Sequence, residues 1–234
     1  MDGNDAARAR ILKASTRLFA EEGFDAARVS RIAEEAGVNK ALIYYYFKSK
    51  EAILDCIMDE LFAALQSFSL EYVQNSIVRL IEEKRLDILS DRFRFIDKTS
   101  QQEFLNETRV YHGRLIDFIT QHRETFRILL LESLKTGKHN DDLFRLFTTL
   151  ISTDESPLYK AIHAADGDFS FSPARLINKF FFNIMPIIQF VIYRSDINAR
   201  LMLDDETLRS LFLNQLDALS ASAVCDNDIM IDSI

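Results

Sequence analysis

Glycine and proline are scarce along this chain, and their scarcity limits what it can fold into more than any other feature. Six glycines and three prolines are spread over 234 residues, of which 48% are hydrophobic. Between these few helix breakers, apolar residues recur over long segments at the spacing of helix faces. The sequence therefore predicts an all-α fold with a sizeable core.

The amino-terminal segment has the pattern of three short helices in succession. In residues 7–22 apolar residues recur at i, i+3, i+4 and i+7, and Gly23 suits the C-terminal cap of that helix. A two-turn helix is expected over residues 29–36 and should stop at Gly37. Asn39 is a good N-cap for the next helix, which should reach about residue 47. Two short helices joined by a tight glycine turn predict a helix-turn-helix.

The remainder of the chain keeps a helical pattern. Ser49 is a good N-cap for a fourth helix, and no glycine or proline separates it from the third. Pro173 suits a first helical position, and Pro186 should kink the same helix. The acidic closing segment, residues 225–234, is expected to be mobile. Further helices are predicted near residues 72–97, 101–121, 123–135, 140–151, 155–164, 173–194 and 205–222.

Charge is distributed unevenly along the chain. The whole sequence has a formal net charge of −8, which by itself would repel nucleic acid. Residues 1–50, however, hold nine Lys and Arg against seven Asp and Glu, a net charge of +2. The remainder holds 19 against 29, a net charge of −10. The basic part of the chain coincides with the predicted helix-turn-helix.

The third predicted helix, within the stretch GVNKALIYYYFKSK, has a face suited to DNA. Successive residues on a helix are rotated by about 100°, so Ile43 and Phe47 should point inward together. Leu42 and Tyr45 then face outward, where they could touch thymine methyl groups and base edges. One helix face cannot bury three consecutive tyrosines, so a plain core stripe is the weaker interpretation. The side chains expected to meet phosphates are Tyr44, Tyr46, Lys40, Lys48 and Lys50.

The segment RILKASTRLFAEEGFDAARVSRIAEEAGVNKALIYYYFKSKEAIL, residues 10–54, resembles the amino-terminal DNA-binding domain of the Tet repressor (TetR) family of bacterial regulators. The resemblance implies a three-helix DNA-binding domain, residues 1–50, joined to a larger helical ligand-binding and dimerisation domain, residues 51–224. The positions that match the recurrent family pattern are Gly23, residues 32–38, residues 44–47 and residues 49–51.

The resemblance also implies roles for single residues. Tyr44 and Lys50 become phosphate contacts, residues 39–42 and Tyr45 lie over the bases, and Tyr46 takes a position where the family often has a phosphate-binding histidine. The full predicted DNA-binding set is Arg28, Ser30, Asn39, Lys40, Ala41, Leu42, Tyr44, Tyr45, Tyr46, Lys48 and Lys50.

Two positions depart from the family pattern. Arg28 stands where the family usually caps the second helix with threonine, and Leu42 stands where threonine is common at the start of the recognition helix. The second helix is thus expected to take its cap from a neighbouring group. The preferred DNA sequence cannot be carried over from the family.

The last two predicted helices carry apolar stripes that suit either the protein's own core or a partner. In the TetR family the corresponding helices form a four-helix bundle with their copies in a second subunit, which implies a homodimer. A two-fold dimer also suits double-stranded DNA, because a palindromic operator doubles the contacts of one short helix. The predicted interface residues are Phe181, Ile188, Leu208, Leu211, Phe212, Gln215 and Leu219.

The family resemblance further implies a small-molecule pocket in the second domain. The phenylalanine-rich middle of the chain is consistent with an apolar cavity, although such residues at helical spacing also form plain core. Polar groups within apolar helices could orient a ligand, and each of them could equally face solvent. The candidates are Arg109, Tyr111, His112, Asn183 and Gln189.

Other classes of protein are disfavoured. The sequence has no glycine-rich phosphate loop, no HExxH or GxSxG motif, and no nucleophilic cysteine with a paired histidine, so we expect no enzyme. Neither the histidines nor Cys56 and Cys225 have metal-ligand spacing, so no metal or other cofactor is expected. No signal-peptide pattern opens the chain, and its most apolar run, residues 180–193, is too short to span a bilayer. A cytoplasmic location without membrane contact is expected.

Taken together, these features predict a ligand-responsive transcriptional regulator, in the form of a repressor released from a palindromic operator by a small apolar or amphipathic molecule. The alternative is a helical adaptor whose helix-turn-helix has become a protein-binding surface. An adaptor would not need Tyr44, Lys48 and Lys50 around the third helix.

Overall fold

The chain folds almost entirely into helices, which confirms the predicted all-α class. The computed structural model describes residues 3–88, 93–151, 156–170 and 172–224, so the predicted mobile segment, residues 225–234, lies outside the described residues. In chain order the elements are α1 (Gly3–Glu22), α2 (Val29–Ala36), α3 (Lys40–Tyr46), α4 (Lys50–Tyr72), η1 (Val73–Val78), α5 (Arg79–Glu82), β1 (Leu86–Ile88), β2 (Phe93–Phe95), α6 (Lys98–Gln121), α7 (Arg123–Ser133), α8 (Asp142–Ile151), α9 (Pro157–Ala165), α10 (Pro173–Asn178), η2 (Lys179–Ile184), α11 (Met185–Leu201) and α12 (Asp205–Val224).

Packing groups the chain into two compact units. The first unit comprises Met1–Leu65 and His122–Leu146, and the second comprises Gln66–Gln121 and Phe147–Ile234. The first unit therefore contains the helices of the predicted helix-turn-helix together with α7, which is distant in sequence. The predicted functional domains, residues 1–50 and 51–224, follow the motif and stay a prediction.

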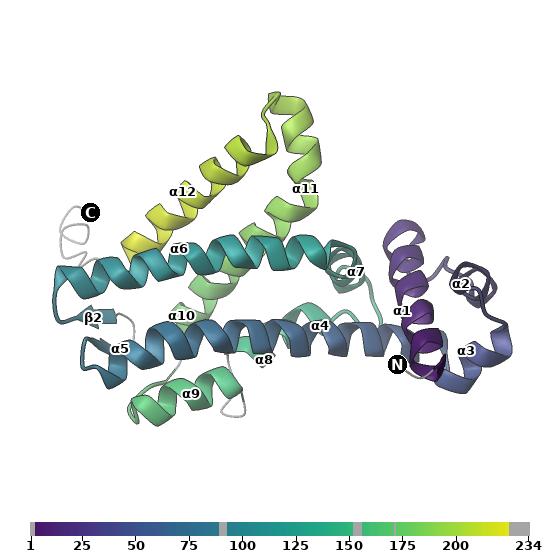
Figure 1. Ribbon diagram of the computed structural model, residues 1–234, viewed down its shortest axis with the longest axis horizontal. Helices are drawn as coiled ribbons and strands as arrows, with labels where there is room; N and C mark the ends of the chain where they lie inside the picture. The colour runs from purple at the N-terminus through teal and green to yellow at the C-terminus, as the bar shows by residue number, and fades with distance from the viewer. Residues whose placement is uncertain (1–2, 89–92, 152–155, 171, 225–234) are drawn as a thin grey trace. The chain divides into compact units, whose positions relative to one another are not determined.

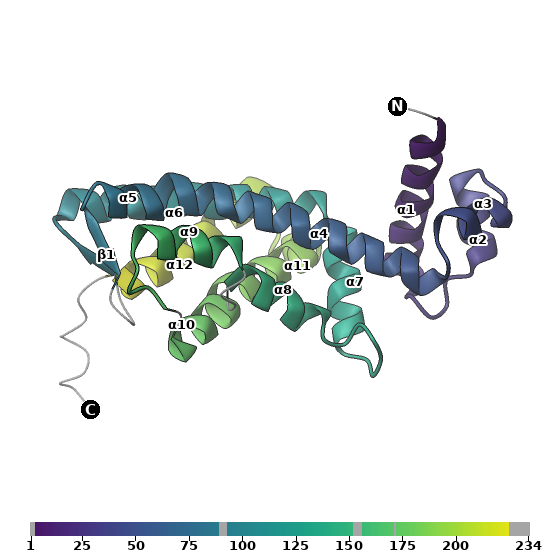
Figure 2. The ribbon, with the colours of Figure 1, turned by 90° about the horizontal axis from the view of Figure 1, so that it is seen from below.

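The first unit is built around α1. Both α2 and α7 pack against α1, and α2 lies beside α3 (Figures 1 and 2). Gly23 ends α1 with a φ of +84°, as predicted, and its N–H donates to the carbonyl oxygen of Phe19 at 3.1 Å. The helical spacing of apolar residues accounts for the core of this unit, whose fully buried side chains include Ile11, Leu18, Phe19, Ile32, Ile43, Ile53 and Phe126.

The structure corrects the predicted helix over residues 72–97. Helical conformation ends at Glu82, Lys84 adopts a left-handed φ of 58°, and the chain then forms the antiparallel hairpin of β1 and β2. Apolar and polar residues alternate along both strands, so one face of the hairpin packs on the core cluster around Phe104. The paired residues are Leu86 with Phe95, Asp87 with Arg94 and Ile88 with Phe93.

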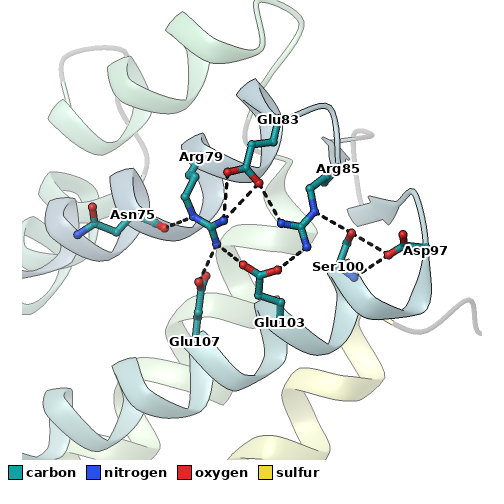
Figure 3. A network of polar contacts seen from close by, with 8 residues as sticks. All are labelled: Asn75, Arg79, Glu83, Arg85, Asp97, Ser100, Glu103 and Glu107. Atoms are coloured by element: carbon teal, nitrogen blue, oxygen red, sulfur yellow. Dashed lines mark hydrogen bonds and ion pairs between the residues drawn. The ribbon is translucent and has the colours of Figure 1, made fainter.

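A network of ion pairs joins α5 and the start of β1 to α6 (Figure 3). Arg79 contacts Glu103 and Glu107, each with a nitrogen–oxygen distance of 2.7 Å. Arg85 pairs with Glu83 at 2.9 Å and also with Glu103. Hydrogen bonds from both arginines lower the pKa of the Glu103 carboxyl, which lies between them. The network therefore favours the charged form of the carboxylate on which the hairpin connection depends.

The long apolar helix near the carboxyl terminus contains a π-helical segment. Elements α10, η2 and α11 follow one another without a break, and the N–H of Met185 donates to the carbonyl oxygen of Phe180, five residues earlier. This wider turn directly precedes Pro186, which has no N–H and whose ring crowds the preceding turn. The kink predicted at Pro186 stays a prediction, and the structure places a π-helical turn directly before this residue.

This helical stretch is longer than the apolar run predicted over residues 180–193. Leu176–Leu201 spans 26 residues with a mean hydropathy of 1.5, so among the described residues it is long and apolar enough to cross a membrane by length and composition alone. Core helices pass the same test, and 28% of its most apolar window is buried within the protein. The exposed apolar side chains of this stretch are Ile177, Phe181, Phe182, Tyr193 and Leu201.

In the second unit α12 packs on α6 (Figure 1, yellow and teal). Arg209 of α12 pairs with Asp117 of α6 at 2.5 Å, and Arg109 of α6 pairs with Asp217 of α12. Each helix supplies one arginine and one aspartate, so the two ion pairs are satisfied together in only one register. The two ion pairs therefore fix the position of α12 along α6.

Candidate nucleic-acid interface

The turn between α2 and α3 determines where α3 points. Gly37 caps α2 in the left-handed conformation, with a φ of +63°, and its N–H donates to the carbonyl oxygen of Glu34 at 3.1 Å. Asn39 caps α3, because its side-chain oxygen accepts a hydrogen bond of 2.8 Å from the N–H of Leu42. Both caps agree with the sequence-based prediction. The Gly37 cap ends α2, and the Asn39 cap starts α3 two residues later.

The inward and outward faces of α3 are those that the helical spacing predicts. Ile43 and Phe47 are buried, with 1% and 6% of their surface exposed. Tyr44 and Tyr45 are 54% and 72% exposed, which is a large fraction for aromatic side chains. The outward face of α3 therefore presents two phenols to solvent, while Ile43 and Phe47 on its inward face pack in the core.

Two acidic residues of the neighbouring helices are paired with arginines. Glu22 pairs with Arg31 at 2.7 Å, and Glu35 pairs with Arg17. Lys40, the first residue of α3, and Lys48, two residues beyond its end, are exposed and have no ion-pair partner among the described residues. Their positive charges remain available to an anionic partner.

Lys50 has a structural task that the sequence did not reveal. Its ammonium donates to the carbonyl oxygens of Phe24, Asp25 and Ala27 at 2.6, 3.2 and 3.1 Å. It also lies 4.4 Å from the ring centroid of Phe24. The lysine thereby ties the first turn of α4 to the connection between α1 and α2. A phosphate contact by Lys50 stays a prediction, and the ammonium would have to share or leave these carbonyl oxygens to make it.

The remaining members of the predicted DNA-binding set lie around the same helices. Arg28 and Ser30 are exposed at the start of α2, and Arg28 makes no side-chain cap bond there. Ala41 is exposed and Leu42 is partly exposed on α3. Tyr46 is partly buried, with its ring edge-on to that of Tyr45 at 5.2 Å. The structure brings the whole set to α2, α3 and the connection to α4, and its contacts with DNA stay a prediction.

A clasp formed by residues 135–145 returns to the helix-turn-helix from the end of α7. Lys135 pairs with Asp25, in the connection between α1 and α2, at 2.9 Å. Lys138 pairs with Asp55 of α4 at 2.7 Å. Arg145 pairs with Asp59 of α4, one turn further on. The clasp therefore holds both segments that Lys50 joins.

The predicted ligand residues do not form one group. Arg109 is engaged with Asp217, Asn183 donates back to the carbonyl oxygen of Asn178 at 3.4 Å, and Gln189 is exposed. Tyr111 and His112 are buried in the second unit, with 8% and 2% of their surface exposed. Only these two candidates lie together in an apolar interior, and ligand binding by any of the five stays a prediction.

Lys179 lies beside this pair and was missed by the sequence analysis. Its ammonium is 5.7 Å from the centroid of the Tyr111 ring. Burial lowers the pKa of Lys179 from 10.5 to about 8. A lysine within the apolar segment INKFFFNI was the available clue, because a cation there must either reach solvent or meet a partner.

The predicted dimer interface contains both exposed and buried positions. Phe181, Leu211 and Leu219 are 57%, 50% and 45% exposed. Ile188 and Leu208 are 0% and 8% exposed, because their side chains belong to the protein's own core, so only the exposed positions could meet a partner directly. Phe212 stacks on Phe190 at 4.1 Å, while Gln215 is exposed. The interface itself stays a prediction.

Comparison with known proteins relates the helix-turn-helix to one group of regulators. Residues 11–57 match the family described as bacterial regulatory proteins, tetR family. The chain is 27% identical over 135 residues to the HTH-type transcriptional repressor NicS of Pseudomonas putida, which covers 58% of this chain and 52% of that protein. It is 33% identical over 90 residues to the HTH-type transcriptional regulator RutR of Escherichia coli, which covers 37% of this chain and 42% of that protein. The chain thus spans about half the length of these curated relatives, or less.

The likeness to solved structures extends over most of the chain. A TetR family transcription regulator from Marinobacter aquaeolei superimposes with a TM-score of 0.58 and 19% sequence identity, covering 92% of this chain and 95% of that one. At this level of identity the likeness concerns the fold alone. It includes the helices beyond the helix-turn-helix.

Proposed function

Since its amino-terminal helices make this chain a member of the tetR family of bacterial regulatory proteins, we propose that it is a DNA-binding transcriptional regulator. In this proposal α3 enters the major groove of double-stranded DNA. The single observation that carries it is the outward face of α3, where the exposed phenols of Tyr44 and Tyr45 lie between the free cations of Lys40 and Lys48. We place the protein in the cytoplasm, with its DNA.

The chemistry of this face divides into two parts. Lys40, Lys48 and the Tyr44 hydroxyl can bind phosphate oxygens, which positions the helix on any sequence. Leu42 and Tyr45 are central on the face and can touch thymine methyl groups and base edges, which makes binding depend on sequence. Glu22 of α1 and Glu35 of α2 oppose this less than free carboxylates would, because Arg31 and Arg17 pair with them.

Two further properties belong to the proposal. The exposed apolar side chains of η2, α11 and α12 would pair with a second copy of the chain, and the dimer would bind a palindromic operator. A small molecule bound in the second unit would lower the affinity for that operator. Repression is supported by the name of the NicS relative, a transcriptional repressor. By linkage, a coupling of about 1–3 kcal/mol would weaken operator binding roughly 5- to 150-fold, and DNA would weaken effector binding equally.

The test begins with selection of DNA by the full-length protein from a random library. Binding of the selected DNA is then titrated at several salt concentrations for the variants Lys48→Ala and Tyr45→Ala. Lys48→Ala should weaken binding to all sequences and reduce the slope of log affinity against log salt by about 1. Tyr45→Ala should change which sequence is preferred.

Lys160→Ala is the matched control, because Lys160 is an exposed lysine on α9 in the other unit. It carries the same change of charge and should leave both readouts unaltered. Failure to select any DNA would refute the proposal and favour a protein-binding adaptor. Equal effects of Lys48→Ala and Lys160→Ala on the salt slope would refute the role given to α3.

A further inference from the structure

The interior of the second unit contains a cation without a counter-charge. Among the described residues no carboxylate pairs with the ammonium of Lys179, and its neighbours are Tyr111 and His112 of α6. Every other buried or half-buried arginine and lysine discussed above has a carboxylate or carbonyl partner. Lys179 is partly buried, and a charge that loses solvent without gaining a counter-charge lowers the stability of the fold.

A second polar group at this place also lacks a partner. The Nδ1 atom of His112 is buried and makes no hydrogen bond with the described residues, although only 2% of the side chain is exposed. Burial and, to a smaller extent, the charge of Lys179 lower the pKa of His112 to about 3. The imidazole is therefore neutral at physiological pH and can place a proton on Nδ1 as a hydrogen-bond donor.

Aromatic rings surround these two groups. Tyr72 and Phe68 stack on Tyr111, with centroid distances of 4.2 and 5.5 Å. The Tyr111 hydroxyl contacts Ser69 at 3.2 Å, and the Tyr72 hydroxyl contacts Thr108 at 2.8 Å. These side chains come from α4 and α6, whereas Lys179 is the first residue of the π-helical segment η2. Such π-helical turns often accompany functional sites.

We propose that Lys179, His112 and Tyr111 form a site for the carboxylate of a small organic acid, with Lys179 as the counter-charge and His112 as a hydrogen-bond donor. We call it the Lys179 site. A monoanion fits one ammonium, because the second charge of a phosphate would stay unpaired in the same surroundings. The stacked rings suit an apolar or aromatic body attached to the carboxylate.

The Lys179 site specifies the chemical class of the effector in the function proposed above. It rests on that proposal only in one respect, because calling the bound acid an effector assumes that the protein is a regulator. Carboxylate binding itself does not depend on DNA. The two ideas can therefore fail separately, since one is measured without DNA and the other without ligand.

The experiment measures thermal stabilisation of the full-length protein by two matched pairs of probes, benzoate with benzamide and octanoate with octanamide, at millimolar concentration. Each amide keeps the body of its acid and removes the charge. At least one carboxylate should raise the melting temperature while its amide does not, because a ligand that binds only the folded state stabilises it.

Lys179→Met should weaken the binding of this carboxylate roughly ten- to hundredfold, as expected for loss of a charged hydrogen bond. Lys179→Arg, which keeps a cation, should retain binding, and Lys160→Met should bind like the unaltered protein.

The pH dependence provides a second test. Lys179 should lose its proton as the pH rises through about 8, so carboxylate affinity should fall above that pH. The titratable groups that face Lys179 do not change over this range. His112 is neutral, and burial raises the pKa of both Tyr72 and Tyr111 above the ordinary value of 10. A carboxylate affinity that stays constant from pH 7 to about pH 9 contradicts the proposal.

Three other outcomes would overturn it: no stabilisation by either carboxylate, equal stabilisation by an acid and its amide, or equal response of the unaltered protein and Lys179→Met. Should Lys179→Met not fold, nuclear magnetic resonance of lysine-labelled unaltered protein decides the matter. Bound carboxylate must raise the pKa of the lysine that titrates near 8, and an unchanged titration refutes the Lys179 site. Failure of the unaltered protein to bind any DNA would refute the regulator proposal, and the results on carboxylate binding would still hold.

Discussion

Replacing Lys179 by methionine should make the ligand-free protein more stable. Methionine keeps an unbranched side chain of similar length and removes the charge that the interior of the second unit does not pair. The pKa of Lys179 falls from 10.5 to about 8 on folding. At about 1.4 kcal/mol for each pKa unit, this difference corresponds to a destabilisation of about 3 kcal/mol at pH 7. We take this as an upper limit, because Lys179 is only partly buried.

The sign of the pH dependence follows from the same values. Below pH 8 the lysine is protonated in both states, so the whole penalty is present. Between pH 8 and 10.5 the unfolded chain binds more protons than the folded protein, and the stability contributed at this position rises with pH. The advantage of Lys179→Met should therefore shrink over this range and vanish above it.

Urea denaturation followed by circular dichroism measures this advantage at a fixed protein concentration. The midpoint of Lys179→Met should lie above that of the unaltered protein at pH 7, and the two should converge towards about pH 10. Lys160→Met, at an exposed position, should show no difference at either pH. The argument is wrong if Lys179→Met is equal to or less stable than the unaltered protein at pH 7, or if its advantage does not depend on pH.

Three further predictions concern the helix-turn-helix and the proposed dimer. Gly37→Ala should lower the free energy of unfolding, measured by urea titration, by about 1 kcal/mol. The added Cβ would meet no atom within 4 Å, but a φ of +63° strains any residue that has a Cβ. An unchanged free energy of unfolding would contradict the left-handed cap. Lys50→Met should lower that free energy by about 2 kcal/mol, since its ammonium serves three carbonyl oxygens; unchanged stability together with weaker DNA binding would instead assign Lys50 to phosphate alone. Leu211→Asp should shift sedimentation from dimer to monomer, whereas Leu134→Asp, at an 88% exposed leucine of the other unit, should not; a dimeric Leu211→Asp would move the interface elsewhere.

Local spacing was sufficient to predict the helix-turn-helix. Gly23, Gly37 and Asn39 determine where helices begin and end through bonds to residues three or four positions away, so their effect can be read along the sequence. The inward direction of Ile43 and Phe47 follows from the helical repeat alone. These features depend on contacts between residues that are close neighbours along the chain, so they can be predicted from the sequence.

The features that the sequence did not reveal depend on partners distant along the chain. Lys50 meets carbonyl oxygens more than 20 residues earlier, and Arg109 meets Asp217 on another helix. The hairpin is an intermediate case, because the alternation in Leu86–Ile88 and Phe93–Phe95 is a local pattern, whereas the sequence analysis assigned residues 72–97 to a helix. Lys179 could be noticed as a cation in an apolar run, whereas the absence of a counter-charge became apparent only in three dimensions.

The clasp of residues 135–145 has a consequence for how fragments and chimeras of this protein can be built. A fragment or chimera cut within α4 would take the helix-turn-helix without α7, which packs on α1, and without the lysines and arginine that pair with Asp25, Asp55 and Asp59. The transferable part is therefore discontinuous, and it must include residues 122–146 together with residues 1–65. A graft made from both segments carries its own scaffold to a new host, whereas a graft of the first segment alone exposes the apolar side of α1.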